Sequence, residues 1–517
     1  MKRPKLAGVF LFVGFLLVYL MFVKRHYDTF QPGAYRQPPH HRLTDNDMSV
    51  SAAGPSYQYG IMFDAGSTGT RIHIFKFQIE NKESPKLAHE TFRAIKPGLS
   101  AYADDPEKCT SGIMELLEVA KSSIPSYLWN ATPVVLKATA GLRLLPGEKA
   151  NHLLDQVRMV FLESPFLFRD ASVSIMEGTD EGISAWITVN FLTGGLHSTN
   201  LPTVGILDLG GGSTQITFSP QDERTIQTSP IDYIRSFQIF NNIHTVYTHS
   251  YLGLGLMSAR LAILGGVDAS PLGGTTELVS PCLAPEYSGR LEHADIVYTV
   301  KGQKAGEAAY EACLNKVEKV LYRKVIKASE AADMDFYAFS YYYDRAVDLG
   351  AIEEKRGGAI TVADYIDGAK RVCSGLSISP LQGPFLCLDL VYISVLLQEL
   401  GFPSHKQFKL ARTINQVETS WALGATFHYI DSWFSRDPKR VKTLGLSQIW
   451  KSLGIPDLAE IQDNLMILDL TKSLESLKLL KLINLKSLKI MDLTGNLEIQ
   501  KTLDYVTSLW GCAKASK

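Results

Sequence analysis

One short pattern occurs twice in the 517-residue chain and constrains its fold more than any other feature. The first copy runs from Tyr59 to Phe75 and the second from Val204 to Phe218. Each copy is an apolar run, an Asp, a turn of Gly, Ser and Thr, and a second apolar run, which predicts a strand, a tight turn and another strand. Because glycine lets the backbone approach a ligand and successive N–H groups can surround an anion, each turn predicts a phosphate site. Two such hairpins facing each other would hold two adjacent phosphoryl groups.

A single copy would be explained equally well as an ordinary glycine-rich hairpin whose Asp bonds to its own turn. Two copies with Asp, Gly, Ser and Thr in the same order favour phosphate binding instead. Asp64 and Asp208 end the first apolar run of each copy. Carboxylates in that position are placed to hold Mg²⁺ or Ca²⁺ through water.

Length and charge bound the remaining possibilities. A chain of 517 residues is too long for one hydrophobic core, so two or more domains are expected. Apolar residues make up 45%, which is enough for a large core. Lys and Arg number 52 against 53 Asp and Glu, and this balance excludes a nucleic-acid binder, which would show a basic excess.

The N-terminus predicts a membrane anchor. Residues 6–23 are uncharged and cover roughly 27 Å at 1.5 Å per residue, enough for a thin bilayer. No small-x-small cleavage site follows directly, so residues 1–25 favour a signal anchor over a cleaved signal peptide. Slightly more positive charge before the apolar run favours a single-pass type II orientation, with the body in the lumen. Residues 26–56 are rich in Pro, His, Gln, Asp and Ser and predict a luminal stalk at which a protease could release the body.

Two further stretches have both a structural and a functional interpretation. Thr139 and Arg143 follow an apolar strand from Pro133 to Ala138 and suit either the polar rim of a cleft or a strand-to-helix turn. Glu181 stands in the first turn of an apolar helix, where the helix dipole favours a carboxylate. Its other interpretation is a general base for water attacking phosphorus. In both cases the residues alone favour the structural interpretation.

Five stretches together resemble the five apyrase-conserved regions of the ectonucleoside triphosphate diphosphohydrolase (apyrase) family. They occur in the family's order, as Asp64–Thr70, Ala138–Leu145, Asp180–Asn190, Asp208–Gln215 and Trp421–Tyr429. The resemblance covers roughly residues 57–432 and is specific, because all five regions are present. The single N-terminal anchor and the short chain are similar to the Golgi and secreted nucleoside diphosphatase branch.

The resemblance implies a fold and its boundaries. The fold is α/β and actin-like, with two ribonuclease-H-like lobes and the active site in the cleft between them. Lobe I would comprise 57–205, completed by 401–432, and lobe II would comprise 206–400.

The resemblance also implies residue roles. Glu181 would activate the attacking water, and Asp64 and Asp208 would hold the water shell of Ca²⁺ or Mg²⁺. The phosphates would be bound by turn and cleft residues, namely Ser67, Thr68, Gly69, Thr139, Arg143, Gly211, Gly212 and Ser213. Tyr343, and after it Tyr342, would contact the nucleoside base, although core packing is the alternative for aromatic residues in this cluster.

Disulfides at Cys282–Cys313 and Cys373–Cys387 are implied by the same branch, in an oxidising lumen. The sequence alone allows other pairings among its six cysteines. Cys109 and Cys512 would remain unpaired.

The function implied is divalent-cation-dependent hydrolysis of the terminal phosphate of GDP, IDP and UDP, with triphosphates used less. We expect a monomeric enzyme on the Golgi membrane, held through residues 6–23, with a secreted or cell-surface form after stalk cleavage. The alternatives are an exopolyphosphatase-like or sugar-kinase-like enzyme of the same fold and a nucleotide-binding protein without catalysis. The regions around Arg143 and Trp421 argue against an exopolyphosphatase-like or sugar-kinase-like enzyme. An intact Glu181 and both intact turns argue against a binding protein without catalysis.

The resemblance ends after Ser432. In the extension at 433–517, Ile467–Thr471 and Ile490–Thr494 recur 23 residues apart, within the range of leucine-rich repeats. Two weak copies are fewer than a repeat core needs, so a partly helical Leu/Lys-rich extension is the favoured interpretation.

Overall fold

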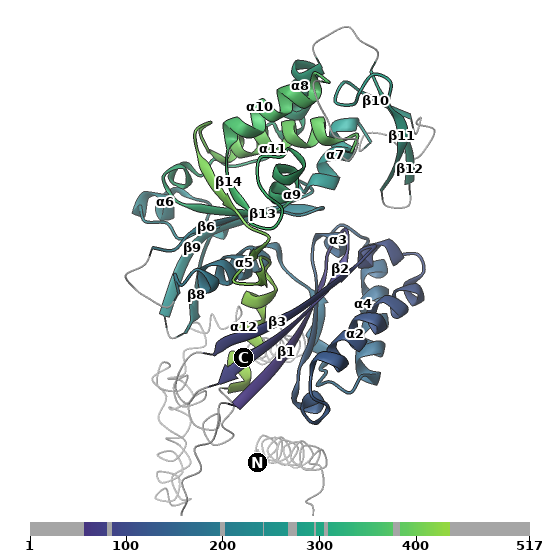
Figure 1. Ribbon diagram of the computed structural model, residues 1–517, viewed down its shortest axis with the longest axis vertical. Coiled ribbons are helices and arrows are strands. Elements are labelled where there is room, and N and C mark those ends of the chain that lie inside the picture. The colour runs from purple at the N-terminus through teal and green to yellow at the C-terminus, as the bar shows by residue number, and fades with distance from the viewer. Residues whose placement is uncertain are drawn as a thin grey trace, which may run out of the picture. The chain divides into compact units, whose positions relative to one another are not determined.

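The computed structural model divides the chain after residue 54, and all the residues that it describes belong to the second of the two units (Figure 1). The described residues are 56–79, 85–196, 202–240, 242–266, 277–293, 296–303, 309–375 and 383–434. The predicted anchor (1–25) lies outside them, as do the predicted stalk apart from Ser56 and the predicted extension apart from residues 433–434. Within these described segments, none of the helices is both long enough and apolar enough to cross a bilayer.

The first sheet contains the first copy of the repeated pattern. Its strands are ordered β3-β2-β1-β4-β5, with β1, β2 and β3 antiparallel and β1, β4 and β5 parallel. They span β1 Ser56–Ala65, β2 Thr70–Ile79, β3 Lys86–Ile95, β4 Val134–Ala138 and β5 Val173–Ile175. The apolar residues of β1 and β4 are buried because helices cover both faces of the sheet. One of these faces carries α2 (Cys109–Ser123) and α4 (Gly147–Glu163).

The second sheet repeats the topology of the first around the second copy of the pattern. Within its order β14-β15-β13-β6-β7-β9-β8, the strands β9-β7-β6-β13-β15 have the same order and directions as β3-β2-β1-β4-β5. Its strands are β6 Gly205–Leu209, β7 Ser213–Phe218, β8 Ile234–Ile239, β9 Asn242–Leu252, β13 Phe336–Ser340, β14 Gly358–Thr361 and β15 Gln407–Leu410. The fold is therefore α/β with two actin-like lobes, and β1–β2 and β6–β7 are equivalent hairpins.

The remaining elements surround these sheets. The helices are α3 Ala140–Arg143, α6 Glu223–Thr228, α7 Leu256–Leu264, α8 Ala309–Leu321, α9 Tyr341–Asp348, α10 Val362–Cys373 and α11 Leu386–Leu400. The 3₁₀ helices are Leu99–Tyr102, Pro106–Lys108, Ser126–Ala131, Asp170–Ser172, Ile231–Tyr233 and Ser329–Asp333. A small sheet contains β10 Glu277–Ser280, β11 Ser288–His293 and β12 Ile296–Gly302, and a hairpin contains β16 Thr413–Ile414 and β17 Val417–Glu418.

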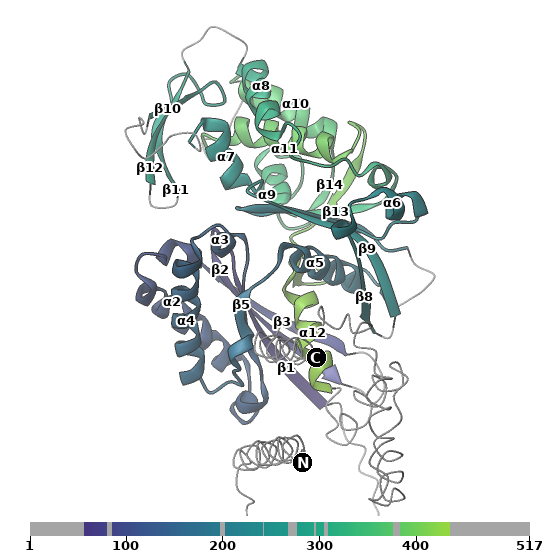
Figure 2. The same ribbon diagram turned by 180° about the vertical axis from the view of Figure 1, so that it is seen from behind.

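Helices α5 (Gly178–Leu192) and α12 (Ala422–Phe434) lie between the two sheets, as Figures 1 and 2 show from opposite sides. The backbone N–H of Gly424 in α12 donates to the Thr188 hydroxyl in α5 at 2.8 Å. Apolar side chains from both sheets and both helices form one buried cluster there. This shared core joins the lobes and fixes the start of α5, which carries Glu181.

One predicted boundary is wrong. Residues 401–432 were assigned to lobe I, but β15 pairs with β13 in the second sheet through Tyr337↔Lys409 and Ala338↔Leu410. Phe408 and Leu410 are buried in the core of that second lobe, which holds the segment there. The chain returns to the first sheet only after Leu410, and Thr426 of α12 then packs over Gly60 of β1.

Both predicted disulfides are confirmed. Cys282–Cys313 joins the loop after β10 to α8, and Cys373–Cys387 joins the end of α10 to the start of α11. Cys109 is a buried free thiol on α2, and Cys512 lies outside the described residues.

Candidate active site

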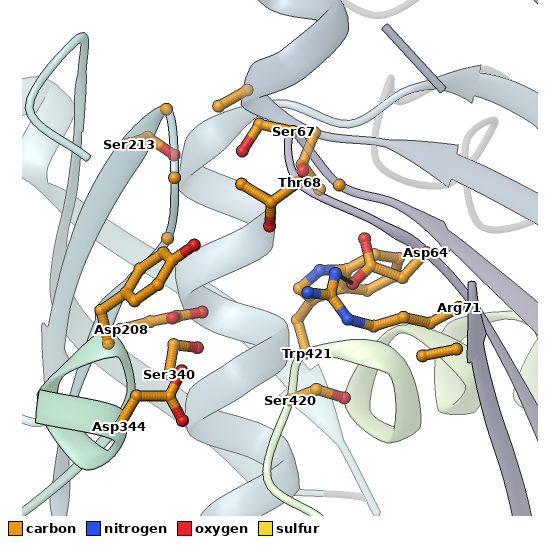
Figure 3. Close-up of a pocket in the computed structure, with 18 of the residues that line it drawn as sticks. Asp64, Ser67, Thr68, Arg71, Asp208, Ser213, Ser340, Asp344, Ser420 and Trp421 are labelled. Carbon is orange, nitrogen blue, oxygen red and sulfur yellow. Dashed lines mark hydrogen bonds and ion pairs between the residues drawn. The ribbon is translucent and has the colours of Figure 1, made fainter. Parts of the chain in front are cut away.

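The two repeated turns meet in a pocket of about 640 Å³ that receives side chains from both lobes (Figure 3). Its volume is typical of a site for a small molecule. A Cβ atom on Gly211 would lie 2.4 Å from the Ser67 hydroxyl, so the second turn approaches the first through a position that has room only for glycine. The two predicted phosphate turns therefore face each other.

Each turn is supported from behind by a glycine of another segment. A Cβ on Gly98 would lie 2.4 Å from the Gly66 carbonyl oxygen, and one on Gly255 would lie 2.3 Å from the Ser213 nitrogen. The first turn of α7 also donates to the second turn, from Met257 N–H to the Gly211 carbonyl at 2.9 Å. Close backbone packing thus fixes the direction in which the turn N–H groups point.

Glu181 lies in the first turn of α5, lines the pocket and is only 7% exposed. The Arg143 guanidinium donates to its carboxylate, and the same nitrogen lies 3.4 Å from the Ser213 hydroxyl in the second turn. Burial raises the pKa of Glu181 to about 8, Arg143 opposes the rise, and the charges of Asp208 and Asp64 add to it. The carboxylate can therefore accept a proton near neutral pH, which suits a general base.

Asp64 and Asp208 occupy equivalent positions, one residue before the ends of β1 and β6. Arg71 donates to Asp64 Oδ2 at 3.0 Å. Within the described part of the chain, Asp64 Oδ1 and Asp208 Oδ1 are buried with no hydrogen-bond partner. Burial and the neighbouring Asp64 charge raise the pKa of Asp208 to about 6. Two mutually repelling carboxylates with unpaired buried oxygens fit a divalent cation.

The protein would supply only part of the coordination shell of such a cation. Among the described residues, no group of three or more His, Cys, Asp or Glu side chains could hold a metal ion together. Water and substrate oxygens would have to complete the shell, as Mg²⁺ commonly requires.

Most of the predicted site residues line this one pocket, and three do not. Those that line it are Asp64, Ser67, Thr68, Thr139, Glu181, Asp208, Gly211, Gly212, Ser213 and Tyr343. Gly69 closes the first turn instead, because its carbonyl accepts the N–H of Gly66 at 3.1 Å. Arg143 directs its guanidinium to Glu181 rather than into the open pocket.

Tyr342 was wrongly predicted as a base contact. Its ring is fully buried in the core of the second lobe, so a ligand in the pocket cannot reach it. Ser340 has a φ of 57° and turns the chain from β13 into α9, which leaves a half-buried Tyr341 and a Tyr343 that is only 3% exposed lining the pocket. Three successive tyrosines gave no sequence signal for this change of direction.

The sequence analysis did not predict most of the charged residues that line the pocket. Both lobes contribute unpredicted charged residues to the pocket, namely Arg71, Lys96, Arg260, Asp344, Arg345, Arg412 and Glu418. Asp389, fully buried in the apolar helix α11, accepts from Arg260 Nε at 2.7 Å and from Arg345 Nη1 at 2.9 Å. A lone carboxylate in an apolar helix was a usable signal, because a buried charge requires a partner.

The duplicated lobes and the pocket between their turns define an actin-like enzyme with its site in the cleft. Residues 51–441 match the model of the GDA1/CD39 (nucleoside phosphatase) family. The chain belongs to this family.

Individual relatives support the same assignment. The chain is 58% identical over 385 residues to ectonucleoside triphosphate diphosphohydrolase 6 of Homo sapiens, covering 74% of this chain and 80% of the relative. It is 50% identical over 387 residues to nucleoside diphosphate phosphatase ENTPD5 of Homo sapiens, covering 74% of this chain and 90% of the relative. A crystal structure of nucleoside triphosphate hydrolases from Neospora caninum shares the fold, with a TM-score of 0.53 at 14% identity over 74% of this chain and 94% of that one.

Proposed function

We propose that this enzyme hydrolyses the terminal phosphate of nucleoside diphosphates such as GDP, IDP and UDP, and uses triphosphates less well. The observation that carries the proposal is the convergence of Glu181 with both phosphate turns in one pocket. Among the relatives, ENTPD5 bears the name nucleoside diphosphate phosphatase. Facing turns suit two adjacent phosphoryl groups, which is the number that a diphosphate offers.

The chain's own residues bind the phosphates and accept the proton, the bridging oxygen of the leaving monophosphate keeps the electron pair of the broken bond, and Glu181 releases its proton to solvent after the step. Backbone N–H groups of the two turns, with the hydroxyls of Ser67, Thr68 and Ser213, bind the phosphoryl oxygens. Thr139 lines the same pocket. Glu181 accepts a proton from water, and the water oxygen forms a bond to the terminal phosphorus as the bond to the bridging oxygen breaks. The products are inorganic phosphate and a nucleoside monophosphate, without a covalent intermediate.

Asp64 and Asp208 would hold Mg²⁺ or Ca²⁺ through water, as their unpaired buried oxygens suggest. When bound, the cation would offset negative charge on the phosphoryl oxygens. Tyr343 is the proposed base contact, and Tyr341 presents a second aromatic ring to the same pocket.

Phosphate release from a nucleotide panel tests this proposal. We expect turnover of GDP, IDP and UDP with Ca²⁺ or Mg²⁺, and slower turnover of the triphosphates. Equal or faster release from ATP than from GDP would overturn the diphosphate preference. Binding without release would favour the non-catalytic alternative, and release from polyphosphate alone would favour the exopolyphosphatase-like one.

We further propose that the enzyme is a monomer on the Golgi membrane, anchored by residues 6–23 with its body in the lumen. The uncharged segment and the charges around it support this. Cleavage in residues 26–56 would release a secreted form. Protease protection of the body in sealed Golgi vesicles is the expected result, and digestion of the body without detergent would contradict it.

A further inference from the structure

One carboxylate of the pocket, that of Asp344, has no hydrogen-bond donor among the described residues. Asp344 is an exposed residue that makes neither a hydrogen bond nor an ion pair with any described residue, and the positive charges of Arg345 and Arg412 act on it through space. Each other carboxylate of the pocket has at least one such contact, in the pairs Asp64–Arg71, Glu181–Arg143, Asp208–Ser340 and Glu418–Arg412, which leave one oxygen of Asp64 and one of Asp208 unpaired. The free acceptor oxygens of Asp344 are therefore available to a ligand.

The position of Asp344 indicates which part of a nucleotide it meets. Asp344 follows Tyr343, the proposed base contact, in the first turn of α9. In Figure 3 it is drawn with Ser340 in the lower part of the view, whereas Ser67, Thr68 and Ser213 are drawn in the upper part. The turn N–H groups and hydroxyls hold the phosphates, and a carboxylate without a bound cation repels phosphoryl oxygens, so the uncharged end of the nucleotide is directed to Asp344.

We propose that Asp344 selects the nucleoside base by accepting a hydrogen bond from a ring N–H beside a carbonyl. Guanine and hypoxanthine present such a group at N1, and uracil presents it at N3. Adenine N1 and cytosine N3 present a lone pair instead, which a carboxylate repels. Guanine adds its 2-amino group as a second donor to the same carboxylate.

This inference rests on the proposed function and explains the preference for its three nucleotides by one chemical group that their bases share. GDP, IDP and UDP share the ring N–H, whereas ADP and CDP lack it. A hydrogen bond between a charged acceptor and a matched donor changes the relative affinity by roughly 10–100-fold. A carboxylate that instead bound the ribose hydroxyls would not distinguish these nucleotides, since all five carry the same sugar.

The test compares IDP with ADP, because their bases differ only at the ring edge that Asp344 is proposed to read. We expect the wild type to have a higher kcat/KM for IDP than for ADP by roughly 10–100-fold. Asp344→Asn should lower kcat/KM for IDP by a similar factor and leave ADP unchanged or improved, since an amide can donate as well as accept.

A matched control removes the same charge from the same helix. Asp348 lies one helical turn further along α9, pairs with Arg345 at 2.8 Å and does not line the pocket. Asp348→Asn should retain the ratio of IDP to ADP. An equal loss for all nucleotides in Asp344→Asn would overturn the inference, as would a wild type that treats IDP and ADP alike.

Binding measurements separate the failure of this inference from the failure of the proposed function. Calorimetry with the same nucleotides needs no turnover. Tighter binding of IDP that disappears in Asp344→Asn would support Asp344 even if no phosphate were released, in which case only the proposed function would fall.

Discussion

Arg143 joins the carboxylate of Glu181 to the hydroxyl of Ser213 through a single guanidinium nitrogen. Glu181 belongs to the first lobe and Ser213 to the second turn, so one side chain connects the proposed base to one phosphate site. The contact opposes the burial that raises the pKa of Glu181. Arg143 therefore orients the carboxylate and favours its charged form against the larger effect of burial.

Glu181→Gln should abolish most turnover while nucleotide still binds. Glutamine keeps the shape of the side chain but cannot accept the proton, and a general base contributes roughly 10²–10⁴-fold to a rate. The measurement is kcat together with nucleotide affinity on the purified variant.

The neighbouring acid supplies the control for this variant. Asp180 is exposed in the same helical turn and does not line the pocket, so Asp180→Asn should retain wild-type kcat. A near-normal kcat in Glu181→Gln would refute the base assignment. Loss of both affinity and kcat would place Glu181 among the cation's ligands instead.

The rate should depend on pH through Glu181. Because burial raises its pKa to about 8, the base form grows from pH 6 to pH 9, and kcat/KM should rise over that range. Arg143 lowers this pKa, so Arg143→Gln should move the rising limb to higher pH. Raising Mg²⁺ should move it to lower pH, since a cation beside Asp64 and Asp208 favours the charged carboxylate. An unchanged pH dependence of kcat/KM in Arg143→Gln would contradict the effect of Arg143 on the pKa of Glu181.

The same group makes stability depend on pH when nucleotide and cation are absent. The folded pKa of Glu181 exceeds its ordinary value of 4.5, so between about 4.5 and 8 the folded state binds more protons than the unfolded state. The free energy of unfolding should therefore fall as pH rises through this window. Glu181→Gln removes this pH dependence. The difference in thermal midpoint, variant minus wild type, should therefore be more positive at pH 8 than at pH 5.

Activity should require a divalent cation held in part by Asp208. Chelation with EDTA should abolish phosphate release, and added Mg²⁺ or Ca²⁺ should restore it. Asp208→Asn removes one of two proposed carboxylates, so the cation concentration giving half-maximal rate should rise. Full turnover in EDTA would exclude a role for the metal, and an unchanged cation requirement in Asp208→Asn would exclude Asp208 from its shell.

Local patterns predicted the repeated elements of the fold. The two apolar-Asp-Gly patterns became the hairpins β1–β2 and β6–β7, and the run from Pro133 to Ala138 became β4. These elements were predictable because their periodicity and turn residues act over a few positions. The assignment of β15 to the second sheet was not, because it depends on pairing with Tyr337 and Ala338 far away in the chain.

The site shows the same division between local and long-range causes. Ser67, Thr68 and Ser213 belong to short motifs and reach the pocket as predicted. Arg260 and Asp344 come from separate helices of the second lobe and carry no local pattern, so only the folded chain places them beside the turns. The pairing of Arg143 with Glu181 is likewise a tertiary contact, across 38 residues.

The glycines behind the turns provide a last prediction. An alanine at 255 would place Cβ 2.3 Å from the Ser213 nitrogen and 2.5 Å from the Gly211 carbonyl carbon. Both atoms belong to the backbone, so the second turn would have to move. Because misplacement by about 1 Å can cost roughly 10²-fold in rate, Gly255→Ala should lower kcat/KM by about that factor. Gly98→Ala should act in the same way on the first turn, since its Cβ would lie 2.4 Å from the Gly66 carbonyl oxygen.

Gly147 is the matched control for these two variants, because a Cβ there would meet nothing within 4 Å. Gly147→Ala should retain wild-type kcat/KM and thermal midpoint. Steady-state rates, thermal midpoints and nucleotide affinities of the three variants give the decisive comparison. If the turns bind phosphate, Gly98→Ala and Gly255→Ala should lose affinity for a nucleoside diphosphate but keep whatever affinity they have for the free nucleoside. Wild-type affinity for the diphosphate in both variants would show that the turns do not bind the phosphates.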